Sequence, residues 1–283
     1  MTRRSFGGWR ARSGFGDGEA LLTTGSAAPS TFAGAGAPPP GDYVIEPFTP
    51  GEIAVRMSGA LVNAALILPA LAFLMLNARQ LLTGWPVVLV GLVAGSFVAD
   101  LVSGVLHWAL DTWFDEHTPP MRRMVIMVRE HHTHPDRIFK YSFWHDAGTL
   151  SWFALVASAP LIAPLVLSHA SVTPIRYALA VAGVTTSLEI VFMLEFHKCG
   201  HRIDRGPLVR SLQRLQLVLA PEHHLRHHVG EHDENYCLIS GLADRTLGRL
   251  GIFRALERVV SVITGAVPRD NDREWCKRYN SAE

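Results

Sequence analysis

The sequence predicts an all-α integral membrane protein built on a four-helix bundle. Its 283 residues are 48% hydrophobic and only 18% charged, whereas about a quarter of the residues of an ordinary soluble protein are charged. Four stretches are long and apolar enough to cross a bilayer as helices. Fourteen histidines are a second departure from ordinary composition, and most of them fall in a few tight groups. A soluble all-helical core is the alternative, and the scarcity of charge disfavours it.

Residues 1–50 are predicted to be a disordered tail in front of one membrane domain over residues 51–283. The tail is rich in Gly, Ala, Ser, Thr and Pro, and no apolar periodicity defines a packed element in it. No apolar stretch follows its first arginines, so a secretory signal is not expected. Its acidic residues and the lack of a clear amphipathic helix disfavour an organelle transit peptide as well.

The first two predicted spans are about residues 57–76 and 85–110. The first runs twenty residues without a charge, which at about 1.5 Å per residue crosses a hydrocarbon core of about 30 Å. The second begins at Trp85, a residue type enriched at the membrane interface. Only Asp100 and His107 interrupt it.

The third and fourth predicted spans are about residues 150–167 and 177–196. Two prolines inside the third are tolerable in lipid, where they are expected to kink the helix. The fourth carries Glu189 and Glu195. An even number of spans places both ends of the chain on the same side of the bilayer.

Lys and Arg are distributed unevenly among the segments that flank these spans. The segment before the first span, the connection over residues 111–149 and the region after residue 196 each carry five or more, whereas the two other connections carry one each. By the positive-inside rule the three basic segments face the cytoplasm. We therefore expect both termini and a cytoplasmic helical cap on that side. A bacterial inner membrane and an endoplasmic reticulum membrane are equally compatible with these charges.

Composition also disfavours two classes of site. The formal net charge is only +1, so the chain lacks the excess of Lys and Arg with which a nucleic-acid binder neutralises phosphates. Its three cysteines have no CxxC spacing, so neither a disulfide framework nor a thiolate zinc site is indicated.

Four separate regions place histidines at or beyond the predicted cytoplasmic ends of the spans. His107 and Asp111 are four residues apart at the end of the second span, so both side chains point along one helix face. His197 and His201 repeat this spacing after the fourth span. The candidate site residues from the four regions are His107, Asp111, His131, His132, His197, His201, His223, His224, His227 and His228.

This pattern predicts a metal site. Imidazole nitrogen is a ligand for zinc, copper, iron or nickel, and a spacing of three or four residues on a helix lets two side chains reach one ion. A structural zinc site needs only about four ligands, so eight or more candidates imply two metals, or one metal with many supporting residues. His117 and His169 are expected at the surface or the interface, and the roles of His134 and His145 stay open.

Oxygen chemistry fits this ligand set better than hydrolysis does. Zinc hydrolases use about three protein ligands and one open position, and the sequence has no GxSxG or HExxH signature. A pair of irons held by histidines can reduce dioxygen to an oxidant that removes hydrogen from an unactivated methylene, and the protein would hold a lipid chain against it in a dry cavity. A metal sensor or transporter would distribute its ligands along the spans instead of at one end.

Four ordered blocks of the sequence carry a resemblance to a known family. They are Asp100-Leu-Val-Ser103-Gly104-Val-Leu-His107-Trp108-Ala-Leu-Asp111, Arg129-Glu130-His131-His132, Phe196-His197-Lys198-Cys199-Gly200-His201 and His223-His224-Leu-Arg-His227-His228. The chain resembles the lipid desaturases called CarF or Kua. The resemblance covers about residues 95–278 and continues through His232, Cys237 and Gly241 to the segment around Gly265, Pro268 and Trp275.

The resemblance implies a membrane-bound di-iron desaturase with O2 as co-substrate. Such an enzyme removes hydrogens from C1 and C2 of the sn-1 O-alkyl chain of an ether phospholipid, and so converts plasmanylethanolamine to the vinyl ether plasmenylethanolamine in plasmalogen biosynthesis. Electrons would come from a cytochrome b5-type protein or a ferredoxin. The alternative is an acyl-lipid fatty acid desaturase or a hydroxylase on the same scaffold, because these reactions share the first hydrogen abstraction.

The resemblance also assigns roles to individual residues. The implied iron ligands are His107, His131, His132, His197, His201, His224, His227 and His228, with His223, Asp111 and His232 as further ligands or supporting residues. Asp100 lies seven residues before His107 on the same helical face, within the predicted bilayer. An ionisable group there usually has a function such as orienting a ligand, and a polar helix-packing contact is the alternative.

Three positions depart from the family's pattern. His134 stands where an Asp is expected, and Cys199 stands where a Trp is expected. Asp146-Ala147-Gly148, preceded by His145, replaces a Thr-Asn-Gly stretch of the animal members. The first and third departures lie near the expected metals or substrate channel, so they leave the identity of the lipid more open than the chemistry.

Overall fold

The computed structural model describes residues 47–79, 84–115, 117–119, 121–166, 172–202, 206–229 and 232–268. The chain divides into two units, residues 1–33 and 34–283, and all of the described residues belong to the second unit. The predicted tail over residues 1–50 lies outside the described residues except for its last four. His169 and Trp275 lie outside them as well.

Every regular element in the described ranges is a helix, as the sequence predicts. In chain order they are α1 (Pro50–Leu76), α3 (Trp85–Thr112), α4 (Arg122–Thr133), the 3-10 helix η1 (Pro135–Lys140), α5 (Phe143–Val166), α6 (Pro174–Val191), α7 (Met193–Gly200), α8 (Gly206–Arg214), α9 (Pro221–His228), the π-helix η2 (Asp244–Gly248) and α10 (Ile252–Thr264).

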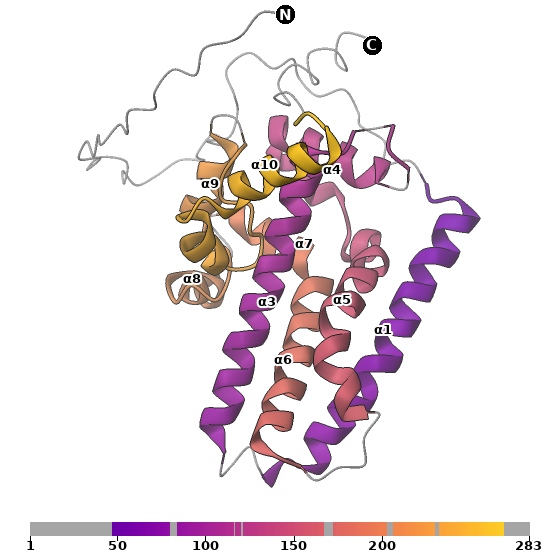
Figure 1. The fold of residues 1–283 in the computed structure, drawn as a ribbon, viewed down its shortest axis with the longest axis vertical. Coiled ribbons are helices and arrows are strands. Elements are labelled where there is room, and N and C mark those ends of the chain that lie inside the picture. The colour runs from indigo at the N-terminus through magenta and orange to yellow at the C-terminus, as the bar shows by residue number, and fades with distance from the viewer. Residues whose placement is uncertain are drawn as a thin grey trace, which may run out of the picture. The chain divides into compact units, whose positions relative to one another are not determined.

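The long helices α1, α3, α5 and α6 run side by side in the second unit (Figure 1). Helix α6 packs between α3 and α5, and α1 packs against α5 and α6. The start of α1, the end of α3, the start of α5 and the end of α6 lie at one end of the bundle, where α4, α7, α9 and α10 gather (Figure 1). This is the four-helix bundle with a helical cap that the sequence predicts.

Three of the described helices are long and apolar enough to cross a membrane, and a bent pair makes a fourth if it counts as one span. The three are α1, α3 and α5, and the bent pair is α6 with α7. The single span predicted over residues 177–196 breaks at Phe192, where α7 turns by 62°. The Phe192 ring packs against Phe143 with centroids 4.8 Å apart. The bend brings α7, which carries His197 and is followed directly by His201, against α9.

Helix α1 begins seven residues before the predicted span because its N-terminus is capped. The Thr49 hydroxyl accepts from the Glu52 amide at 3.3 Å, and the Glu52 carboxylate accepts from the Thr49 amide at 2.7 Å. Pro50 occupies the first turn, where its missing N–H is not needed. A prediction from hydropathy misses this first part of the helix, because the capping residues are polar.

The outer surfaces of the bundle are apolar. Leu61, Leu68, Val90 and Val156 are each more than 60% exposed, although each lies within a long helix. Extensive exposed apolar surface marks a membrane or protein contact. Together with the helix lengths it supports a multi-pass membrane protein.

Small residues bring the spans close together. A Cβ added at Gly95 of α3 would lie 2.5 Å from the Ala182 carbonyl oxygen of α6, and one added at Gly91 would lie 2.7 Å from the Ala178 carbonyl oxygen. Glycine at these two positions therefore permits the close approach that stabilises helix pairs in lipid. The Thr186 hydroxyl donates to the Gly95 carbonyl oxygen at 3.0 Å across the same interface.

Candidate metal centre

Four segments deliver the candidate residues to one place in the cap. The end of α3 supplies His107 and Asp111, and the last turn of α4 supplies an adjacent histidine pair. Helix α7 and the residue after it supply His197 and His201. Helix α9, which starts at Pro221, supplies the rest. The side chains form two groups, and within each group the ligand atoms lie within 4.8 Å of one another. The sequence prediction that the separate regions meet is therefore confirmed.

The first group consists of five imidazoles, those of His131, His197, His201, His224 and His228. His224 Nε2 lies 2.8 Å from Nε2 of both His197 and His201, and 3.1 Å from Nε2 of His228. A neutral imidazole offers one N–H or one lone pair at this atom. The converging nitrogens therefore cannot all be satisfied by one another, whereas a cation among them would accept several lone pairs at once.

The second group consists of His107, Asp111, His132 and His227. His107 Nδ1 donates to the Tyr236 carbonyl oxygen at 2.9 Å, and His227 Nδ1 donates to the Glu234 carbonyl oxygen at 2.8 Å. Because a carbonyl oxygen only accepts, Nε2 of both rings carries a lone pair. These two Nε2 atoms lie 3.4 and 3.6 Å from Asp111 Oδ2. Three acceptors thus face one another, which is the arrangement a metal ion requires.

Burial keeps at least three histidines of the two groups neutral. The pKa of His132, His224 and His227 is lowered well below 6.5, because burial removes water from the charged form and neighbouring imidazoles repel it. Protonation of these rings therefore does not relieve the repulsion between the acceptor atoms that face one another. Eight imidazole nitrogens and one carboxylate oxygen suit zinc, copper, iron or nickel, so the residues fit the metals that the sequence predicts.

The two groups are immediate neighbours. Of the pair His131-His132, the first residue belongs to the first group and the second to the second group, and His228 and His227 divide in the same way. The ring centroids within these pairs are 5.8 and 5.6 Å apart. The division therefore offers two neighbouring candidate sites, each of which could hold one metal ion.

Two histidines that were predicted as ligands or supporting residues lie outside the groups. His223 points away from its neighbour His224, and its Nε2 lies 3.0 Å from Asp244 Oδ2. His232 stacks on His132 with ring centroids 4.2 Å apart. His232 thus lies against the second group, and His223 lies against a carboxylate instead.

The remaining described histidines lie apart from both groups. His117 is exposed. His134 follows α4, and its Nδ1 lies 3.0 Å from the Thr133 hydroxyl. His145 Nδ1 lies 3.0 Å from Asp146 Oδ1.

Asp100 holds a backbone segment in place. Its side chain is fully buried, and Oδ1 accepts from the amides of Ser240 and Gly241 at 2.8 and 3.1 Å, while Oδ2 accepts from the Ala243 amide at 2.9 Å. The Ile239 amide also reaches Oδ1, at 3.3 Å. Asp100 therefore anchors the segment that follows the carbonyl bonded to His107.

A second carboxylate anchors the start of this segment, and sequence reasoning missed it. Asp244 Oδ2 accepts from the Cys237 amide at 2.8 Å and also faces His223. A Cβ at Gly104 would lie 2.6 Å from Cys237 Sγ, so only glycine lets the segment lie this close to α3. The one sequence signal for Asp244 is an isolated carboxylate after the apolar run from Tyr236 to Ala243.

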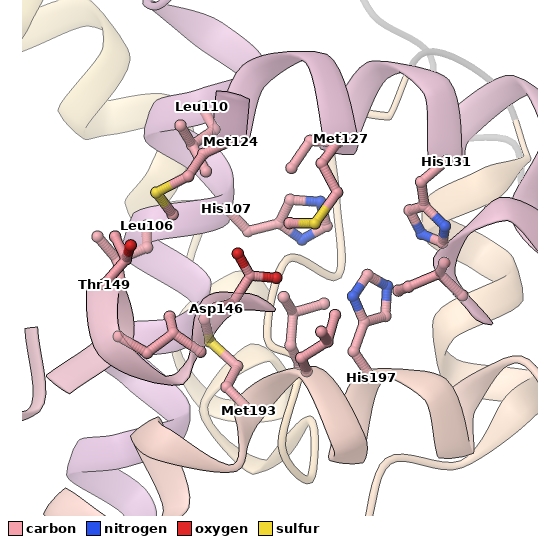
Figure 2. A pocket seen from close by; sticks show the side chains of 15 residues that line it. Leu106, His107, Leu110, Met124, Met127, His131, Asp146, Thr149, Met193 and His197 are labelled. Carbon is pink, nitrogen blue, oxygen red and sulfur yellow. The ribbon is translucent and has the colours of Figure 1, made fainter. Parts of the chain in front are cut away.

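An apolar pocket lies beside both groups (Figure 2). Side chains from α3, α4, α5 and α7 line it, among them Met124, Met127 and Met193. His107 of the second group and His131 and His197 of the first group also line it. A chain lying in this pocket would contact both groups, and the unbranched methionines can adapt to its shape.

One polar corner interrupts this apolar lining. Figure 2 shows the Asp146 carboxylate pointing into the pocket, with Thr149 nearby. The Asp146 side chain is only 10% exposed, and its Oδ2 has no hydrogen-bond partner within the described part of the chain. Arg56 of α1 donates to the Thr149 hydroxyl at 2.8 Å. Asp146, the first residue of the departure noted at residues 146–148, therefore lies in the pocket wall.

Apolar spans, a histidine-rich candidate metal centre and an adjoining apolar pocket define a membrane protein equipped to act on a lipid chain. Residues 96–271 match the family model described as the lipid desaturase domain. The chain belongs to this family, and the protein is therefore a lipid desaturase, an oxidoreductase. The family resemblance predicted from the histidine blocks is confirmed.

Curated relatives agree with this assignment. The chain is 29% identical over 244 residues to mouse plasmanylethanolamine desaturase 1, covering 82% of this chain and 85% of the relative. It is 31% identical over 180 residues to plasmanylethanolamine desaturase of Myxococcus xanthus, covering 63% and 62%. It is 32% identical over 178 residues to the chloroplastic fatty acid desaturase 4 of Arabidopsis thaliana, covering 62% and 52%. No solved structure matches the chain.

Proposed function

We propose that the protein converts a plasmanylethanolamine to a plasmenylethanolamine, with two iron ions in the two histidine groups. The reaction removes two hydrogens from C1 and C2 of the sn-1 O-alkyl chain and leaves a vinyl ether. The names of the mouse and Myxococcus relatives support this substrate. The electron donor is a cytochrome b5-type protein or a ferredoxin, and both termini lie in the cytoplasm.

The observation that carries the proposal is the position of the apolar pocket. It is lined by His107 from one group and by His131 and His197 from the other. A saturated chain in this pocket would lie against both groups without water between them. The chemistry that two bound irons supply is the reduction of O2 to an oxidant able to take hydrogen from an unactivated methylene.

The described residues would bind and orient the lipid. Met124, Met127 and Met193 enclose the alkyl chain and exclude water, which protects a reactive oxidant from side reactions. Asp146 is the carboxylate that lines the pocket, and with Arg56 and Thr149 close by it makes this corner suited to the glycerol and head group. The chain would then be held near its polar end, where C1 and C2 lie.

A second candidate is an acyl-lipid desaturase or a hydroxylase on the same scaffold. Two observations favour it: the Arabidopsis relative is named a fatty acid desaturase, and Asp146, one of the residues that depart from the animal pattern, lines the pocket. In this case oxidation would fall on an acyl chain, and no vinyl ether would form.

Lipid analysis of a host that makes alkyl ether phospholipids but no plasmalogen separates these candidates. We expect acid treatment of its lipids to release long-chain aldehydes when the protein is expressed with iron, because acid cleaves vinyl ethers. The matched control is the same host with the His224→Ala variant, which should give only background aldehyde. New double bonds or hydroxyl groups in the acyl chains, without aldehyde, would contradict the vinyl ether assignment and favour the second candidate.

A further inference from the structure

The proposed reaction needs two electrons that the lipid does not provide. Forming a double bond from two methylenes releases two hydrogens with two electrons, whereas reducing O2 to two waters takes four electrons and four protons. The other two electrons and two protons must come from an external reductant. This inference rests on the proposed function, and it concerns where that reductant binds.

A second pocket lies on the other side of the segment that holds the second histidine group. Glu234 and Tyr236 line this pocket, and their carbonyl oxygens accept from Nδ1 of His227 and His107. One layer of backbone therefore separates the pocket from two of the candidate metal ligands. Within the described residues, the pocket shares no lining residue with the apolar pocket, so a reductant there would leave the lipid site free.

Arginine side chains dominate the wall of this second pocket. Those that line it are Arg226, Arg245, Arg249 and Arg254. Among the acidic residues of the wall, Asp233 pairs with Arg254 at 2.8 Å, and Asp244 is buried against the Cys237 amide. Glu234 is exposed. The wall thus holds four arginines against three carboxylates, which leaves the pocket, defined here as the arginine pocket, with a net positive charge.

We propose that the arginine pocket is the docking site of a small, acidic electron-transfer protein. Opposite charge guides such a partner to the correct face and speeds its association. Redox complexes of this kind bury small interfaces and dissociate quickly. Docking here would bring the donor to the backbone layer that bonds to His107 and His227. The lipid would meanwhile contact the two groups from the apolar pocket.

Binding measurements test this proposal without relying on turnover. Full-length protein in lipid nanodiscs is titrated with a [2Fe–2S] ferredoxin and with the haem domain of a cytochrome b5, at low and at high salt. We expect at least one of the two to bind, more weakly at high salt. The double variant Arg226→Glu with Arg249→Glu should bind it about tenfold more weakly or worse. The matched charge reversal Arg79→Glu, beyond the end of α1, should bind like wild type.

Two results would overturn the proposal: equal affinity of the double variant and wild type, or binding of neither probe to wild type. Turnover adds a second readout, because the KM for the protein donor should rise in the double variant, whereas turnover driven by dithionite should change by less than about twofold. A wild-type protein that binds the donor but makes no vinyl ether with dithionite would refute the proposed function and leave the docking site standing.

Discussion

The His224→Ala variant is expected to lose desaturase activity and to lose metal, while it still inserts into the membrane. His224 is fully buried, and its Nε2 lies within 3.1 Å of the Nε2 atoms of three other histidines of the first group. Removing it takes away one ligand and opens a void at the centre of the group. The measurements are acid-released aldehyde from the host lipids, the iron content of the purified protein and its yield in the membrane fraction.

The neighbouring His223 provides a matched control on the same helix. Its Nε2 faces Asp244 instead of either group, so His223→Gln should keep its metal and lose only some stability. If His223→Gln loses as much metal as His224→Ala, then His223 is a ligand and the boundary of the first group must be redrawn. Activity and metal near wild type in His224→Ala would mean that the site lies elsewhere.

Replacing Asp100 by leucine is expected to prevent stable folding of the cap. Its carboxylate accepts four backbone N–H groups in a fully buried position. Each buried donor left without a partner costs about 1–3 kcal/mol, and the sum is comparable with a whole stability of about 5–15 kcal/mol. We expect a large fall in the melting temperature of the detergent-solubilised protein, together with loss of iron.

The Asp100→Asn variant separates hydrogen bonding from charge. Asparagine keeps one acceptor oxygen, which can serve the amides of Ile239, Ser240 and Gly241, but it presents an NH2 group to the Ala243 amide. Its melting temperature should therefore fall between those of wild type and Asp100→Leu. An Asp100→Leu protein that melts like wild type would show that the segment after Tyr236 does not depend on this carboxylate.

The helix bundle was predictable because the length of each apolar stretch can be read directly from the sequence. Residues 57–76 and 85–110 correspond to α1 and α3, although the capping box at Thr49 starts α1 earlier. The bend at Phe192 was not predictable, since hydropathy continues unbroken through it. At the bend the Phe192 ring packs against Phe143, a contact between segments far apart in the sequence.

Spacing of histidines predicted the regions of the site but not its division into two groups. Adjacent residues such as His131 and His132 point to different groups, and only tertiary structure decides this. The carbonyl oxygens of Glu234 and Tyr236 leave no sequence signal, because every residue has one. Asp100 was singled out from its position in an apolar span, seven residues before His107. Its partners, which are backbone amides far along the chain, could not be read from the sequence.

The iron content of the purified wild-type protein tests the two-group centre most directly. Metal analysis after expression with iron should give about two iron ions per chain, because the nine side chains form two separate groups of nitrogen and oxygen ligands. His224→Ala should lower this value, whereas His223→Gln should not. Zinc in place of iron in the active preparation, or no bound metal in a folded and active protein, would contradict it.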